Sequence, residues 1–253
     1  MLRGADISTP APNKEATYNT IARSLVDSSF LASLLDGLHS AHEASQSTGP
    51  NRKQTSVYGV VETDYLSVLA RLALASPHIL VSALSATTPA SSPSSPPLPW
   101  LLSEWFLHYD NIGSVTQKKL HALALTNLLS LLPDPYYTPL LLSNLQSYLS
   151  TWTNIITELA DDSSSDPNAK QQDYLVNWST HENSSPENDP PETIRRRDWD
   201  NADPLHSIDM QAFVRERLHA LVASCGGESR FQEEWLVNVD GDVVGGFAGL
   251  GLF

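Results

Sequence analysis

The sequence predicts an all-α protein whose helices stack as an α-α superhelix, a HEAT/armadillo-like solenoid with disordered acidic and Ser/Pro-rich loops. Three observations support this prediction. Apolar residues recur at helical spacings of three and four along most of the chain. Ser, Thr and Pro mark where the helices start and stop. The central helical unit, Ser114 to Asp161, is roughly 45 residues long, which is the length of a HEAT or armadillo repeat.

The composition allows a sizeable buried core and limits the cellular compartment. The chain has 253 residues, of which 41% are hydrophobic. Its one cysteine leaves no disulfide framework, and the residues after Met1 lack the apolar core of a secretory signal. The apolar run Leu120 to Leu132 is too short for a membrane span. We therefore expect a protein of the cytosol or nucleus with no membrane span.

The formal net charge is −14, and the acidic residues are concentrated late in the chain. The segment from Glu158 to Asp203 contains twelve acidic and four basic residues, and the segment from Glu228 to Asp242 contains five acidic residues and one basic residue. Phosphate binding needs clustered Lys and Arg, so a nucleic-acid partner is not expected. A basic protein partner fits this charge, and so does the simpler explanation that acidic loops keep an apolar solenoid soluble.

In chain order, residues 1–13 are expected to be a flexible terminus, and HEAT-like helical repeats occupy residues 14–162. A first helix covers Ala16 to His42, with a break around Asp27 to Ser29. A polar loop follows, and the next helix covers Glu62 to Ala75. Ser76 and Pro77 then cap a short helix that reaches about Leu84.

A Ser/Pro-rich loop at residues 87–99 is expected to interrupt the repeats, because it has too few apolar side chains to pack. After it, Ser114 and Gln117 fit a capping box for an apolar helix from Val115 to Leu132. Pro133 and Pro135 stop that helix. Thr138 and Pro139 restart the chain as one helix from Pro139 to Ala160.

Residues 163–201 combine charge, serine and proline and are predicted to form a disordered acidic loop. Residues 202–253 are expected to hold the C-terminal helices: a clear one from Ser207 to Cys225, ended by Gly226 and Gly227, and two short amphipathic pieces. The tryptophans Trp100, Trp105 and Trp152 lie on apolar helix faces and are expected to pack in the core.

No motif marks catalysis, a cofactor or a metal, so none of these is predicted. His39 and His42 are three residues apart, a spacing that a metal could use, but no third ligand is near in sequence. A Ser/His or Cys225/His pair is left open by the sequence, although nothing marks one. The glycines from Gly245 onward lack the preceding strand of a phosphate loop. Arg195 to Arg197 are surrounded by acids, which favours local charge pairing.

Several stretches resemble the importin-beta (karyopherin-beta) nuclear transport receptors, in the importin-eleven-like branch and near its C-terminus. One is Trp105 and Phe106 with Asp110 to Ile112, followed by Lys118 to Leu125. Another is Asp203 to Met210 with Phe213, and a third is Phe231 to Leu236. Together these stretches cover about half of the chain.

The resemblance implies the C-terminal part of a receptor that binds protein cargo for Ran-dependent transport between cytoplasm and nucleus, with nucleoporins as possible further partners. Ran GTPase would bind the family's N-terminal repeats, which this chain lacks. Basic cargo would meet acidic residues that a solenoid could hold beside its concave face, and the candidate partner-binding residues are Asp161, Asp162, Asp166, Glu187 and Asp189. The alternative is a free-standing helical-repeat scaffold or adaptor without transport activity.

Overall fold

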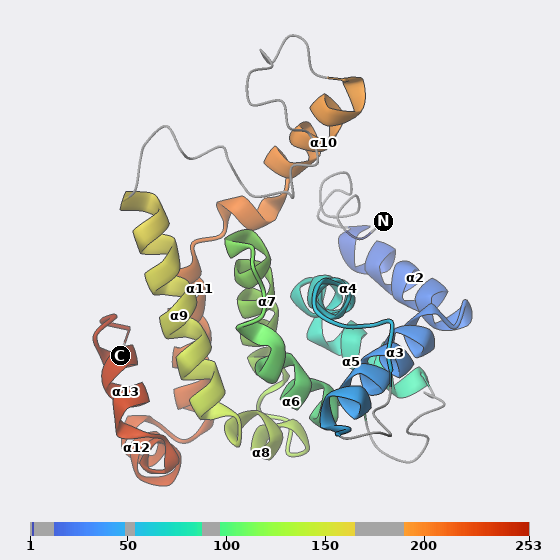
Figure 1. Cartoon of the computed structure of the whole chain (residues 1–253). Coiled ribbons are helices and arrows are strands. Elements are labelled where there is room, and N and C mark those ends of the chain that lie inside the picture. The colour runs from blue at the N-terminus through green and yellow to red at the C-terminus, as the bar shows by residue number, and fades with distance from the viewer. Residues whose placement is uncertain (1, 3–12, 49–53, 88–96, 165–189, 253) are drawn as a thin grey trace.

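The computed structural model describes residues 2, 13–48, 54–87, 97–164 and 190–252, and these residues form helices, turns and loops without any strand (Figure 1). The all-α prediction is confirmed. Within the same residues, no helix is both long and apolar enough to cross a bilayer.

Four helices make up the N-terminal half: α2 (Lys14–Asp27), α3 (Phe30–Gln46), α4 (Val60–Ala75) and α5 (Pro77–Ala86). The predicted break near Asp27 is confirmed, because Ser29 adopts a left-handed backbone with a φ of 59°. The predicted cap is confirmed too, since the Ser76 hydroxyl accepts a hydrogen bond from the Ile79 amide at 3.4 Å. In the predicted loop at 87–99, residues 88–96 lie outside the described residues.

The first helix of the central part begins at Pro97, inside the loop that was predicted to reach residue 99. The central part contains α6 (Pro97–Tyr109), α7 (Val115–Leu128), the 3-10 turn η2 (Leu129–Leu131), α8 (Tyr137–Leu142) and α9 (Leu145–Ser164). Pro97 to Pro99 belong to the first turn of α6, where a proline's missing amide costs no hydrogen bond. The Ser114 cap is confirmed by its bond from the Gln117 amide at 3.4 Å.

The single helix predicted from Pro139 to Ala160 is wrong, because the chain turns between α8 and α9 at Ser143 and Asn144. Both side chains bond the Leu140 carbonyl, and such bonds offer the backbone an alternative to a continuous helix. Thr138 lies inside α8 and donates to the Asp134 carbonyl instead of capping the helix.

The C-terminal part contains α10 (Pro191–Asn201), η4 (Pro204–Ser207), α11 (Met210–Ser224), α12 (Glu228–Glu234), η5 (Leu236–Asn238) and α13 (Gly241–Ala248). Helix α10 corrects the end of the loop predicted to reach residue 201, although its described side chains are exposed. Helix α11 ends as expected: the Gly227 amide bonds the Val222 carbonyl and the Gly226 amide bonds Ala223, a Schellman motif with both glycines at positive φ.

Helix α7 occupies the centre of the molecule, with α4 on one side, α9 on the other and α11 against it as well (Figure 1). Nine consecutive residues from Leu120 to Leu128 are buried, which explains why apolar residues run almost all the way round this helix. The C-terminal helix α13 packs on α9, and α2 packs on α5. The buried side chains form one continuous hydrophobic core through all these helices.

Candidate functional site

Helix α7 carries three buried polar side chains, and each one bonds a neighbouring helix. The His121 imidazole receives the indole N–H of Trp105 on α6 at 2.9 Å. The Thr126 hydroxyl receives the indole N–H of Trp152 on α9 at 2.7 Å. The Asn127 amide donates to the carbonyls of Ala73 and Leu74 at the end of α4. These bonds fix the positions of three helices around α7.

His121 also contacts a serine, which raises the question of a catalytic pair. Its Nε2 lies 2.9 Å from the Ser67 hydroxyl on α4. Since the Trp105 indole can only donate, Nδ1 of His121 must accept and Nε2 must carry the proton. The Ser67 hydroxyl then accepts from His121 and donates to the Thr63 carbonyl at 2.8 Å. This tautomer cannot take a proton from Ser67, so the pair lacks the base of a hydrolytic dyad.

Burial has a strong effect on His121. The His121 side chain has no exposed surface, and its desolvation lowers the pKa of His121 to about 3. The imidazole is therefore neutral at physiological pH. Cys225 is partly buried, and burial raises the pKa of its thiol, so it is not an activated nucleophile.

A second polar group lies where α3, α4 and α6 meet. The buried Glu104 carboxylate lies 2.9 Å from Nδ1 of His42 and 3.5 Å from Nε2 of His108. Nδ1 of His108 is in turn 3.9 Å from Glu62. The hydrogen bond to Glu104 raises the pKa of His108. Burial opposes ionisation of Glu104, but its bonds to both histidines outweigh that cost and lower its pKa.

His39 does not join His42 in a metal site. Its ring stacks on Trp100 of α6, with centroids 3.5 Å apart, and burial lowers the pKa of His39. Across the described ranges, no group of three or more His, Cys, Asp or Glu side chains is arranged to hold a metal ion. The two histidines instead help to join α3 to α6.

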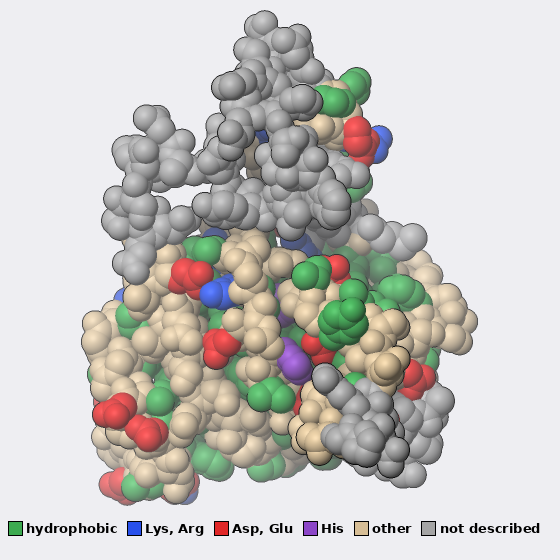
Figure 2. Space-filling view, in the orientation of Figure 1, with side chains coloured by type: hydrophobic (Ala, Val, Ile, Leu, Met, Phe, Trp, Pro, Cys, Tyr) green, Lys and Arg blue, Asp and Glu red, His purple; other side chains and the backbone are tan. Residues whose placement is uncertain are grey.

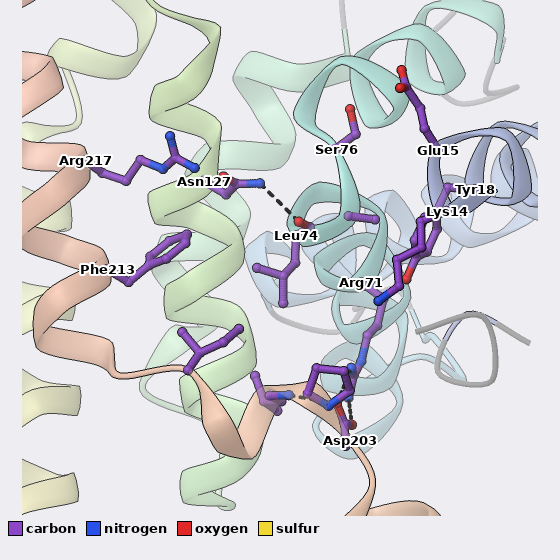
Figure 3. A pocket seen from close by; sticks show the side chains of 14 residues that line it. Lys14, Glu15, Tyr18, Arg71, Leu74, Ser76, Asn127, Asp203, Phe213 and Arg217 are labelled. Atoms are coloured by element: carbon purple, nitrogen blue, oxygen red, sulfur yellow. Dashed lines mark hydrogen bonds and ion pairs between the residues drawn. The ribbon is translucent and has the colours of Figure 1, made fainter. Parts of the chain in front are cut away.

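A cavity of about 640 Å³ opens between the two halves of the chain (Figure 3). Its walls come from α2, the turn between α4 and α5, α7, η4 and α11. Five charged side chains line it: Lys14, Glu15, Arg71, Asp203 and Arg217. The remaining lining is mostly apolar, with two aromatic rings.

One strong ion pair closes a side of this cavity. The guanidinium of Arg71 makes a bidentate contact with the carboxylate of Asp203, and Nη1 to Oδ1 measures 3.0 Å (Figure 3). The Asp203 side chain is fully buried and also accepts the Leu205 amide at 3.0 Å, which caps η4. The pair connects positions 132 residues apart and ties η4 to α4.

The structure does not test whether the predicted partner-binding residues form one site. Asp161 and Asp162 lie in the last turns of α9, but nothing is described of their side chains; Asp166, Glu187 and Asp189 lie outside the described residues. Of the Arg195 to Arg197 cluster, Arg195 pairs with Glu192, as local charge pairing predicts.

Sequence reasoning missed the cavity and the cluster around Glu104. A signal for both was present. Arg71 is the only charged residue in the apolar second half of α4, and Glu104 and His108 lie four residues apart in the mostly apolar α6. Charges at such positions need buried partners, although the partners themselves are distant in sequence.

Comparison with known proteins places the chain in a family. The family model described as "Importin-11-like, TPR repeats" matches residues 2–252. The chain belongs to the importin-11-like family. It is also 26% identical over 223 residues to the "Importin beta-like protein kap113" of Schizosaccharomyces pombe, a match that covers 87% of this chain and 19% of that protein. No solved structure matches the chain.

The resemblance to the importin-eleven-like branch is therefore confirmed, and this importin-11-like chain spans about a fifth of the curated relative that it matches. The family description calls the repeats TPR, whereas the sequence length indicated HEAT-like repeats. Both kinds are stacked pairs of helices whose neighbours bury one continuous core. The helical-repeat solenoid is thus supported by the family as well as by the helices.

Proposed function

We propose that the chain is a cargo-binding part of a nuclear transport receptor that moves between cytoplasm and nucleus. The observation that carries this proposal is the family match over nearly the whole chain. Nuclear transport receptors are not an enzyme class, and the tautomer of His121 is consistent with that.

The cargo we propose is basic, because exposed acids are concentrated near the C-terminus. On α12, α13 and the turn between them, five acids are exposed: Glu228, Glu233, Glu234, Asp240 and Asp242. Figure 2 shows acidic side chains at the lower left, where Figure 1 places these helices. Only one of the five, Glu234, forms an ion pair among the described residues, with Arg230 at 3.2 Å. The others are available to lysine and arginine side chains of a partner.

We propose that a second acidic segment binds the same basic partner, through Asp161, Asp162, Asp166, Glu187 and Asp189. Like-charged segments attract a basic protein over long range, and salt weakens this attraction because charges are screened beyond about 10 Å at 0.1 M ionic strength.

Titration of the purified chain with a lysine-rich histone tail peptide tests the proposal. We expect weak binding that falls as salt rises. The double variant Glu233→Gln with Asp242→Asn should bind the peptide more weakly. A second variant, in which the five proposed residues of the other acidic segment are changed to amides, should also bind it more weakly. For the Glu233→Gln and Asp242→Asn pair the matched control is Asp27→Asn with Asp64→Asn, which removes the same two charges from exposed positions on α2 and α4. Equal losses in the control would mean that net charge alone attracts the peptide.

Ran provides a second test. We propose that Ran-GTP binds the N-terminal repeats of a full receptor, so it should neither bind this chain strongly nor displace the basic peptide. Tight binding would contradict this assignment. A blot of the endogenous protein separates the receptor from a free-standing scaffold, since a much larger product supports the receptor.

A further inference from the structure

Two cationic side chains that line the cavity between the two halves of the chain, Arg217 and Lys14, have no carboxylate oxygen closer than 4.0 Å among the described residues. Arg217 on α11 has a buried Nε with no hydrogen-bond partner among the described residues, and its nearest carboxylate oxygen, on Glu216, is 4.0 Å from Nη1. Lys14 on α2 has no ion pair with any described residue. We propose that this cavity binds a short peptide segment that carries a carboxylate beside apolar side chains.

The charge of the cavity favours a carboxylate although the chain as a whole is acidic. Arg71 and Asp203 neutralise each other. In Figure 3 the side chain of Glu15 points away from that pair, whereas Lys14 and Tyr18 point toward it. Lys14 and Arg217 outnumber the one remaining acid of the lining, Glu15, so the cavity has a net charge of +1. An arginine guanidinium with free donors matches a carboxylate by forming two parallel hydrogen bonds.

Arg217 is also held ready for such a contact. Its guanidinium carbon lies 5.3 Å from the centre of the Phe213 ring, one turn earlier on α11. This cation–π contact limits the motion of the side chain, so less freedom is lost when a ligand binds. In Figure 3 the Arg217 side chain extends from α11 toward Asn127, across the cavity from α4 and α2.

Size and lining favour a peptide over a small inorganic anion. A volume of about 640 Å³ is within the range of ligand pockets and far exceeds that of a single phosphate. Leu74, Ala75 and Ile208 add apolar surface beside the charges. A leucine or phenylalanine next to the acid would bury this surface, which a bare anion would leave wet. The carboxylate can be an internal Asp or Glu side chain or the C-terminus of the partner.

Fluorescence anisotropy with labelled short peptides tests the proposal on the whole chain. The peptides share flanking leucines and carry a central Glu or Gln, each with a free or an amidated C-terminus. Binding of the Glu peptide with an amidated end identifies a side-chain carboxylate, and binding of the Gln peptide with a free end identifies a terminal one. If neither binds more tightly than the Gln peptide with an amidated end, the proposal is wrong.

Variants then locate the binding. Arg217→Gln should weaken it at least about tenfold, because a charge-assisted bidentate contact is lost. Arg215→Gln is the matched control, since it removes the same charge from an exposed position on the same helix, and it should change affinity less than about twofold. Equal effects of the two variants would show that only general electrostatics attracts the peptide.

A variant that keeps every charge completes the test. Ala75→Leu fills part of the cavity and should abolish binding while the thermal melting curve stays cooperative. Unchanged binding by Ala75→Leu would place the peptide outside the cavity and overturn the proposal. The outcome is independent of basic cargo, because the acidic residues of α12 and α13 are untouched in all three variants.

Discussion

The indole N–H of Trp105 donates to Nδ1 of His121 at 2.9 Å, and this one bond determines how α4, α6 and α7 share a buried polar network. It fixes the tautomer of His121, which in turn fixes the direction of the bond to Ser67. A histidine in this position is a structural connector between helices.

The pH dependence of stability follows from the same histidine. Its folded-state pKa of about 3 is below the ordinary value of 6.5, so between those values the unfolded chain binds more protons than the folded one. Stability should therefore fall as the pH falls below 6.5, by at most about 1.4 kcal/mol per pH unit from this group. Urea unfolding of the parent and of His121→Gln, which keeps an acceptor for Trp105, measures the difference.

The control for that series is His219→Gln, which changes an exposed histidine on α11. The parent and His219→Gln should lose stability in parallel as pH falls, and His121→Gln should lose less. If His121→Gln kept the parent's pH dependence, the neutral buried imidazole would be contradicted.

Leu123 is fully buried at the centre of α7. Leu123→Asp would bury a carboxylate without a partner, and we expect a loss of several kcal/mol, enough to unfold the domain. Circular dichroism and thermal melting measure this loss. Leu107→Asp on α6 is the control, because Leu107 is 62% exposed and should tolerate the charge. Parent-like melting of Leu123→Asp would mean that α7 does not occupy the core.

The pair of Arg71 and Asp203 should be costly to break on one side only. Asp203→Asn leaves the guanidinium without its counter-charge, and we expect a loss of about 3 kcal/mol in the free energy of unfolding. Glu234→Gln breaks the exposed pair with Arg230 and should cost less than about 1 kcal/mol. Denaturant titration of both variants compares the pairs, and similar losses would rule out the special role of the buried one.

Substitution of Tyr148 should change the stability in the opposite direction. Its hydroxyl is buried without a hydrogen-bond partner in the described part of the chain, and burial raises its pKa. Tyr148→Phe removes the orphaned group and should leave stability unchanged or raise it by about 1 kcal/mol. Tyr109→Phe, which removes a bond to the Lys118 carbonyl, should lower stability slightly. Destabilisation by Tyr148→Phe would reveal a partner for the hydroxyl.

The helices could be predicted from the sequence because their signals are local. The apolar spacing of α7, the caps at Ser76 and Ser114 and the glycines after α11 need only nearby residues. The turn between α8 and α9 was missed because Ser143 and Asn144 are tolerated inside helices, and only their bonds to Leu140 end the first one. Helix α10 was missed because its polar composition is shared by helices and loops.

The candidate sites were harder to predict for a different reason. Arg71 and Asp203 are 132 residues apart, and Arg217 reaches the cavity only through the packing of α11 on α7. No local pattern relates such residues. Lone charges in apolar helices, such as Arg71 and Glu104, indicate that a partner exists without identifying it.

The packing across the cavity also bears on how the chain could be assembled. Helices α11 and α13 contact α7 and α9 over their apolar faces. In addition, Arg71 forms an ion pair with Asp203, which follows residues 165–189 in the sequence. These contacts, and not the backbone connection through residues 165–189, hold the C-terminal helices in place. Two separately expressed fragments, divided within 165–189, should find each other and reconstitute the fold by complementation, with the apolar face of α11 as the recognition surface.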